Sequence, residues 1–153
     1  MAKPPLYLLD TSVLVAYVRA GPVGEYVEQT YHLRQSGFKP LICVVSAGEI
    51  LSLARQFEWE DEKVKVMADL LREFVWVDIS LPEICEAYAE IDSFSRSKGM
   101  PMGKNDVWIA AATKVTSATL LTMDKDFDHL ADSHISRVLI SHEVYGPGVL
   151  QSS

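Results

Sequence analysis

The sequence predicts an α/β fold in which one mostly parallel sheet of about five strands is flanked by helices. Short runs rich in aliphatic and β-branched residues alternate along the chain with longer segments whose apolar side chains recur at helical spacing. Strands that alternate with helices in this way form parallel sheets. The chain has 153 residues and shows no repeat or linker, so we expect one domain over residues 1–145 and a flexible tail over 146–153.

The first half of the chain supplies two of the expected strands. A short apolar run at 6–9 predicts a buried strand, and Asp10 then opens a helix. A second helix follows the break at Gly21 and should end at Gly37, because glycine is favoured just past a helix. The second strand is expected at 41–45. The helix after it begins between Ser46 and Glu49, and a further helix begins near residue 61.

The second half of the chain supplies the other three strands. Residues 75–79 predict a weaker strand, and the apolar spacing from Pro82 predicts an amphipathic helix. A loop at 99–103 precedes a strongly apolar helix at about 106–115. The last two strands are expected at 118–121 and 137–140, with a short polar segment between them.

Composition limits the class of protein. Apolar residues make up 48% of the chain, which is ordinary for a globular domain. The longest purely apolar run spans only residues 107–112, whereas a membrane-spanning helix needs roughly 20 residues. The N-terminus lacks the pattern of a secretory signal. Cys43 and Cys85 are isolated and are interpreted as small buried hydrophobic side chains. These features place the protein in the cytoplasm and not in a membrane.

Net charge argues against one class of partner. Fourteen basic and 21 acidic residues give a net charge of −7. A protein with a large sequence-independent nucleic-acid surface is normally basic. A nuclease remains compatible with this charge if the acids are concentrated around a metal ion.

The most informative feature of the sequence is four acids that each follow a short apolar run: Asp10, Glu49, Asp106 and Asp124. In an open parallel sheet, ligands bind outside the carboxyl ends of the strands. Acids from four distant segments would therefore meet at one edge of the fold. Like charges repel at short range unless a cation neutralises them. The pattern predicts a divalent metal that prefers oxygen ligands, and cleavage of a phosphodiester as its function.

Each acid also has a purely structural explanation. Asp10 could cap the helix that it opens, and Ser46 with Glu49 has the spacing of a capping box. Asp106 could interact with a helix dipole, although Asn105 already offers a cap. Asp124 could belong to a solvated turn, pinned to the core by Phe127 and Leu130. Only the four acids together point specifically to a metal site.

These residues resemble a known family. Asp10-Thr-Ser, Glu49 after the second strand, Asn105-Asp106 before an apolar helix, and Thr122-Met-Asp124-Lys-Asp-Phe are similar to the motifs of a PIN domain. More narrowly, they resemble the VapC-like toxins of type II toxin–antitoxin systems. The resemblance runs from residue 6 to about 140 and keeps the order of the motifs.

The resemblance implies a Mg²⁺- or Mn²⁺-dependent ribonuclease that a cognate antitoxin inhibits. It places the catalytic and metal-binding positions on Asp10, Glu49, Asp106 and Asp124, with Asp10 and Asp106 as the most dependable ligands. Supporting polar groups fall on Thr11, Ser12, Asn105 and Thr122. It also implies a homodimer, and whether Asp126 joins the site is left open.

One short segment could contact the RNA substrate. Residues 93–105 contain no acidic residue and carry Arg96, Lys98 and Lys104 just before Asp106. These cations could guide a phosphate backbone to the metal, although a solvated loop explains them equally well. The four histidines show no zinc-ligand spacing.

Three other functions compete with the toxin interpretation. A phospho-acceptor module of the receiver type would need an acidic pair after the first strand, where only Asp10 stands. A non-catalytic PIN-fold binding module has little reason to keep four mutually repulsive acids. A PIN-domain nuclease that processes RNA without an antitoxin keeps the same chemistry, and the residues do not separate it from the toxin.

Overall fold

Five parallel strands form the centre of the protein. The computed structural model describes residues 4–35, 37 and 39–141. The strand order is β3-β2-β1-β4-β5, and every neighbouring pair is parallel. The strands are β1 (Tyr7–Leu9), β2 (Leu41–Cys43), β3 (Val75–Val77), β4 (Thr119–Thr122) and β5 (Ser136–Leu139). The predicted α/β class and the predicted number of strands are thus confirmed.

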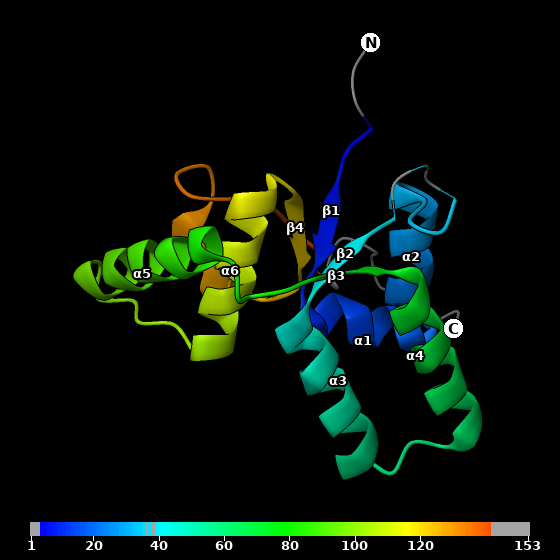
Figure 1. Ribbon diagram of the computed structural model, residues 1–153. Coiled ribbons are helices and arrows are strands. Elements are labelled where there is room, and N and C mark those ends of the chain that lie inside the picture. The colour runs from blue at the N-terminus through cyan, green and yellow to red at the C-terminus, as the bar shows by residue number, and fades with distance from the viewer. Residues whose placement is uncertain (1–3, 36, 38, 142–153) are drawn as a thin grey trace.

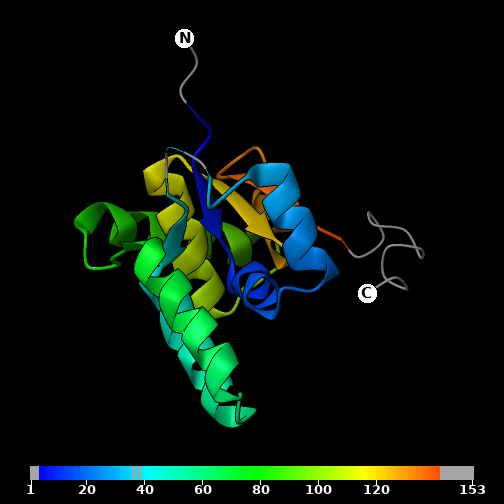
Figure 2. The ribbon, with the colours of Figure 1, turned by 90° about the vertical axis from the view of Figure 1, so that its right-hand side faces the viewer.

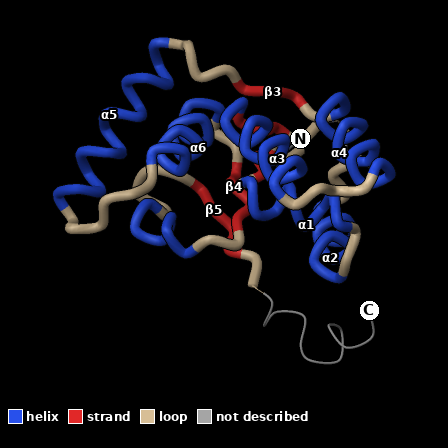
Figure 3. The backbone as a smooth tube through the Cα atoms, turned by 90° about the horizontal axis from the view of Figure 1, so that it is seen from below, coloured by secondary structure: helices blue, strands red, loops and turns tan. Residues whose placement is uncertain are grey.

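Helices cover both faces of this sheet, as Figures 1 and 3 show. One core cluster joins the sheet to the four helices of the first half of the chain: α1 (Thr11–Arg19), α2 (Pro22–Tyr31), α3 (Val44–Gln56) and α4 (Asp61–Glu73). The second cluster joins it to α5 (Pro82–Ser97), α6 (Lys104–Thr116) and the 3₁₀ helix η1 (Lys125–Leu130). Figure 2 shows α3 and α4 extending beyond the sheet. Among the described residues, no helix has both the length and the apolarity to cross a membrane.

The alternation of side chains along the strands explains the two clusters. Leu8 and Leu9 are both fully buried, yet Leu8 belongs to one cluster and Leu9 to the other. Leu120 and Leu121 on β4 divide in the same way. Successive side chains on a strand point to opposite faces, so a short run that is apolar at every position fits a sheet covered on both sides.

The strand order creates a binding edge between β1 and β4. From β1 the chain winds outward through β2 and β3, and it then returns to place β4 on the other side of β1. In such sheets the crevice at the carboxyl ends, where the winding direction reverses, is the usual ligand site. The Asp10 N–H donates a 2.9 Å hydrogen bond to the Leu121 carbonyl. This bond fixes Asp10 beside the end of β4.

The structure corrects the expected start of α3. The second strand ends at Cys43, not at residue 45, and the helix already includes Val44. Ser46 and Glu49 therefore lie inside the helix, and the interpretation as a capping box is wrong. Their side chains instead contact Thr11. The contact with Thr11, which is distant in sequence, takes the place of the local hydrogen bonds that a capping box would form.

Other boundaries also shift. Helix α2 ends at Tyr31 with His32 as its left-handed cap, not at Gly37. Helix α6 begins at Lys104 with Gly103 at the N-cap position, so Asn105 lies in the first turn and is not the cap. Cys43 is buried as expected, but Cys85 is exposed. The predicted tail at 146–153 lies outside the described residues.

Candidate metal centre

Asp10 is the most deeply buried acid of the predicted site. It is the N-cap of α1, and its Oδ1 accepts a 2.8 Å hydrogen bond from the Thr11 N–H. Only 4% of the residue is exposed. Burial raises the pKa of Asp10, while hydrogen bonds from Thr122, Ser12 and Thr11 lower it and the nearby charge of Asp124 raises it further. The carboxylate therefore needs these donors, or a cation, to stay ionised inside the protein.

Two hydroxyl groups hold the other oxygen of Asp10. The Thr122 hydroxyl donates to Oδ2 at 2.7 Å, and the Ser12 hydroxyl donates to the same atom at 3.1 Å. Thr122 also accepts a 2.9 Å hydrogen bond from the Asp124 N–H. The Thr122 side chain thus couples the acid that follows β1 to the acid that follows β4.

Glu49 reaches the site from α3 and is oriented by α1. The Thr11 hydroxyl lies 2.7 Å from the Glu49 Oε1 atom and 2.9 Å from the Ser46 hydroxyl oxygen. Ser46 is fully buried. These contacts fix the first turn of α1 against the second turn of α3. Thr11, predicted as a supporting residue, thus positions Glu49.

Asp106 is repelled by the other acids of the predicted site. It lies in the first turn of α6, half-buried, ahead of the fully buried Val107. Burial raises the pKa of Asp106 to about 7, and the charges of four neighbouring acids add to the effect: Asp10, Asp124, Asp126 and Glu49. Each of those four acids is therefore close enough to repel it. The carboxylates predicted from separate segments do meet at one edge.

Asp124 and Asp126 complete the cluster at the start of η1. Asp124 is the N-cap of η1, and its Oδ1 accepts a 2.9 Å hydrogen bond from the Asp126 N–H. Asp106, Asp124 and Asp126 each place a carboxylate oxygen within 4.8 Å of the other two. Phe127 and Leu130 are fully buried and anchor η1, as predicted.

The donor set fits a divalent cation. Three carboxylate oxygens converge, and carboxylates are the ligands that Mg²⁺ and Mn²⁺ prefer. Among the described residues, no lysine, arginine or histidine forms an ion pair with any acid of the cluster. A cation bound at the cluster would offset this repulsion.

Within the described residues, none of the three predicted RNA-contacting cations forms an ion pair with the carboxylate cluster. Arg96 pairs with Asp92 one turn earlier on α5, at 3.0 Å. The Lys98 Nζ atom lies 5.4 Å from the centre of the Phe94 ring. Lys104 is the first residue of α6 and is exposed. The segment does lead into Asp106, and its contact with RNA stays a prediction.

Asp126 is the residue that the sequence pattern did not assign. It lies two positions after Asp124, in a segment where Asp128 follows at the same interval. Both look like solvated turn acids, but Asp128 pairs with Arg137 at 3.1 Å and does not join the cluster. Only the geometry of the 3₁₀ helix separates the two.

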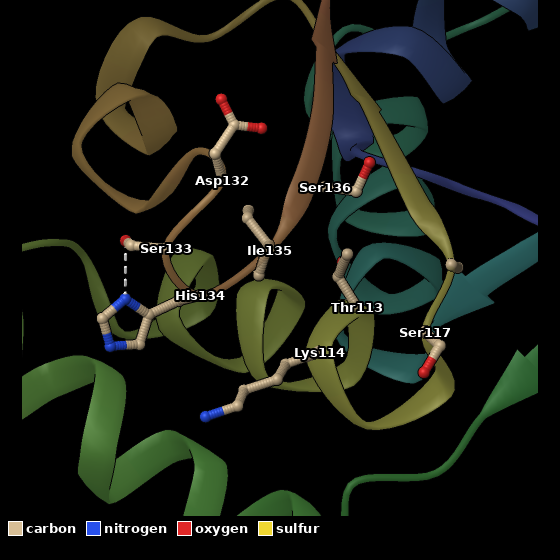
Figure 4. A pocket seen from close by; sticks show the side chains of 9 residues that line it. Thr113, Lys114, Ser117, Asp132, Ser133, His134, Ile135 and Ser136 are labelled. Atoms are coloured by element: carbon tan, nitrogen blue, oxygen red, sulfur yellow. Dashed lines mark hydrogen bonds between the residues drawn. The ribbon is translucent and has the colours of Figure 1, made fainter.

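A different pocket lies at the opposite edge of the sheet. The side chains in Figure 4 surround a cavity of about 400 Å³ at the starts of β4 and β5. It is lined by Lys114 and His134, and by Asp132 as its one acid. His134 is hydrogen-bonded to the neighbouring Ser133 at 2.9 Å. This pocket lacks converging carboxylates and is not the predicted site.

Comparison with known proteins agrees with this geometry. The sequence profile of the PIN domain family matches residues 7–133. A curated relative, Ribonuclease VapC1 of Haemophilus influenzae (strain R2866), is 25% identical over 130 residues, which cover 83% of this chain and 93% of the relative.

Solved structures share the fold. The structure of VapBC2 from Rickettsia felis, bound to a DNA fragment from their promoter, contains a chain that matches with a TM-score of 0.72 at 18% identity. The match covers 88% of this chain and 98% of that one. VapBC-1 from nontypeable Haemophilus influenzae matches with a TM-score of 0.67 at 21% identity, over 88% of this chain and 97% of the other.

Proposed function

This chain belongs to the PIN domain family, and we propose that it is a divalent-metal-dependent ribonuclease, the toxin of a toxin–antitoxin pair. The observation that carries the proposal is the carboxylate cluster of Asp106, Asp124 and Asp126, with Asp10 and Glu49 beside it. A curated relative named as a ribonuclease aligns over most of its own length. The substrate class follows from that relative, and the chemistry follows from the acids.

The carboxylates would hold the cation, with Mg²⁺ or Mn²⁺ as the ion. Asp106, Asp124 and Asp126 offer converging oxygens. Asp10 has both oxygens engaged by hydrogen-bond donors, which fixes its orientation toward the cluster. A divalent cation bound there supplies Lewis-acid chemistry, which activates water and neutralises charge on a phosphodiester.

The chain's own residues set the protonation state of the site. Asp106 must lose its proton to act as a ligand, and its pKa of about 7 places this step near neutral pH. Thr122 and Ser12 donate hydrogen bonds to the ionised form of Asp10. Thr11 does the same for Glu49. These hydroxyl groups keep the acids aligned without adding charge, so the site stays negative enough to hold a cation.

A protein partner has support in the exposed apolar side chains of α3 and α4. Phe57 is 67% exposed at the end of α3, and Leu51, Val64 and Val66 are also exposed. Exposed apolar side chains on two helices offer surface that a protein partner could cover. We assign the antitoxin as the inhibitory partner because the similar solved structures are VapBC complexes. A homodimer is the other contact that we propose.

The direct test is cleavage of RNA by the purified protein. Mg²⁺ should support cleavage of single-stranded or structured RNA, EDTA should stop it, and Asp106→Asn should lack it. Inactivity of the wild-type chain on every RNA tested would contradict the proposal. A small adjacent reading frame with a DNA-binding N-terminus would support the toxin role, whereas its absence would favour an RNA-processing nuclease with the same chemistry.

A further inference from the structure

Neither close packing nor backbone conformation requires a glycine at Gly48. It lies in the interior of α3, where glycine destabilises a helix relative to alanine. A Cβ atom added at Gly48 would meet nothing within 4 Å. At Gly24, by contrast, a Cβ would lie 2.8 Å from the carbonyl oxygen of Ala16. Close packing of α1 on α2 thus explains Gly24, and no contact within the described part of the chain explains Gly48.

The open space at Gly48 is part of a pocket beside the acids. The pocket has a volume of about 580 Å³, and Glu49 and Thr11 of the candidate metal centre line it. Its size falls within the range of about 300–1,000 Å³ that is typical of small-ligand sites. A residue that leaves backbone bare at such a place allows a ligand to approach closely.

The other lining residues define what the pocket would bind. Its polar groups include two side-chain amides, Gln56 and Asn105, and its apolar groups are Val45 and Leu53. Gln56 uses one N–H on the Ser52 hydroxyl at 2.9 Å, which leaves its carbonyl and second N–H available. Asn105 makes no side-chain hydrogen bond to any residue that the structure describes. Amides that offer both donors and acceptors match the edge of a nucleobase.

The charge of the pocket favours a base over a phosphate. Among the described residues that line it there is no lysine or arginine, and Glu49 is acidic. A second pocket, of about 630 Å³, adjoins the cluster through Asp126 and contains Lys125 and His129. An RNA strand that reached both pockets would thus meet neutral amides in one and a cationic side chain in the other.

We propose that the pocket between α3 and α6 holds the nucleobase next to the cleaved phosphodiester, with Gly48 permitting its approach and Gln56 reading its edge. The inference rests on the proposed ribonuclease function and adds residues that set sequence preference. It explains why the helix keeps a glycine that weakens it. Stability and activity should therefore respond in opposite directions at this position.

The experiment compares Gly48→Ala, Gln56→Ala and the wild-type protein on a panel of RNA oligonucleotides with Mg²⁺. Gly48→Ala should raise the Tm by about 1–4 °C and lower kcat/KM by about tenfold or more, mainly through KM. It should also weaken binding of a phosphorothioate oligonucleotide that resists cleavage. Gln56→Ala should reduce the discrimination between the preferred base and the others by about tenfold while cleavage continues.

A matched control separates stability from activity. Ala89 is exposed in the interior of α5, away from both pockets. Ala89→Gly should lower the Tm by a similar amount and leave kcat/KM unchanged. The inference is overturned if kcat/KM rises with the Tm in Gly48→Ala and falls with the Tm in Ala89→Gly.

Other outcomes are also decisive. Unchanged RNA binding and cleavage in Gly48→Ala would contradict the proposed nucleobase pocket. A lower Tm for this variant would contradict it too. A changed oligomeric state, or weaker antitoxin binding with normal cleavage, would assign the pocket to a protein partner instead. The ribonuclease proposal itself fails only if the wild-type protein cleaves no RNA in the panel.

Discussion

At the amino-terminal edge of the sheet, Glu73 and Glu90 are paired with basic side chains, whereas at the carboxyl-terminal edge acids face acids. Lys114 pairs with Glu90, and Arg34 binds Glu73 through two nitrogens, at 2.6 and 3.1 Å. At the other edge, the pKa of Asp106 rises to about 7 because burial and its acidic neighbours oppose its charge. Paired charges need no explanation beyond the fold. Unpaired like charges are typical of functional sites, and here they agree with the proposed metal site.

The largest effect should come from removing one charge of the acidic edge. Asp106→Asn keeps the size of the side chain and lowers the repulsion, so the protein should fold as well as the wild type. RNA cleavage in Mg²⁺ should fall by about 1,000-fold or more, because a cation contributes several kcal/mol to such reactions. Gel-based cleavage assays measure this loss. Cleavage within tenfold of wild type would mean that Asp106 is not a ligand.

A smaller effect should follow from uncoupling the two central acids. Thr122→Val removes the hydroxyl that donates to Asp10 and accepts from the Asp124 N–H. Groups that orient metal ligands typically affect activity by about 10–100-fold, and unpaired buried partners cost about 1–3 kcal/mol of stability. Cleavage rates and denaturant unfolding would measure the two losses. A stability loss without any change in cleavage would leave Thr122 a structural residue only.

The acidic edge should also give the metal-free protein an unusual pH dependence. The pKa of Asp106 is raised from 3.8 to about 7 in the folded state. A raised pKa means that the folded state binds the proton more tightly than the unfolded state. The resulting stabilisation is present below about pH 4 and is lost as the pH rises to about 7.

Melting temperatures measured in EDTA between pH 4.5 and 8 would detect this loss. Asp106→Asn should remove it. Asp132→Asn, at the pocket of the opposite edge, is the matched control and should leave the pH dependence unchanged. The same slope in wild type and Asp106→Asn would show that other groups cause it.

The smallest effect is expected at the amino-terminal edge. Lys114→Ala breaks a partly exposed pair with Glu90. Exposed ion pairs contribute about 0–1 kcal/mol, so unfolding should change little and RNA cleavage should stay within about twofold of wild type. A large loss of cleavage would show that the amino-terminal edge also takes part in function.

Several features of the fold and of the acidic edge were predictable from the sequence. The α/β class and the meeting of Asp10 with Asp124 followed from apolar runs that end at an acid, since parallel strands present their carboxyl ends together. The same expectation is wrong for Asp106, which follows α5 and a loop and lies in the first turn of α6. Glu49 lies inside α3 and not at the end of β2. The burial of Phe127 and Leu130 followed from their apolar character in a polar segment. These features depend on local pattern and on a general rule of parallel sheets.

Features that depend on tertiary contacts were not predictable. Ser46 and Glu49 have capping-box spacing, yet the helix begins two residues before Ser46, and Thr11 provides their partner. Asp126 and Asp128 look alike in sequence, but only Asp126 joins the cluster, because Asp128 is paired with Arg137. The order of the strands, which puts β1 beside β4, is likewise set by packing of distant segments.

The most direct test of the account is the change in melting temperature when Mg²⁺ or Mn²⁺ is added at pH 8. A ligand that binds only the folded state stabilises it by mass action. The wild-type Tm should rise with metal concentration, and the Asp106→Asn/Asp124→Asn double variant should not respond. A wild-type Tm that does not move, or an equal rise in the double variant, would contradict the claim that these carboxylates form a metal site.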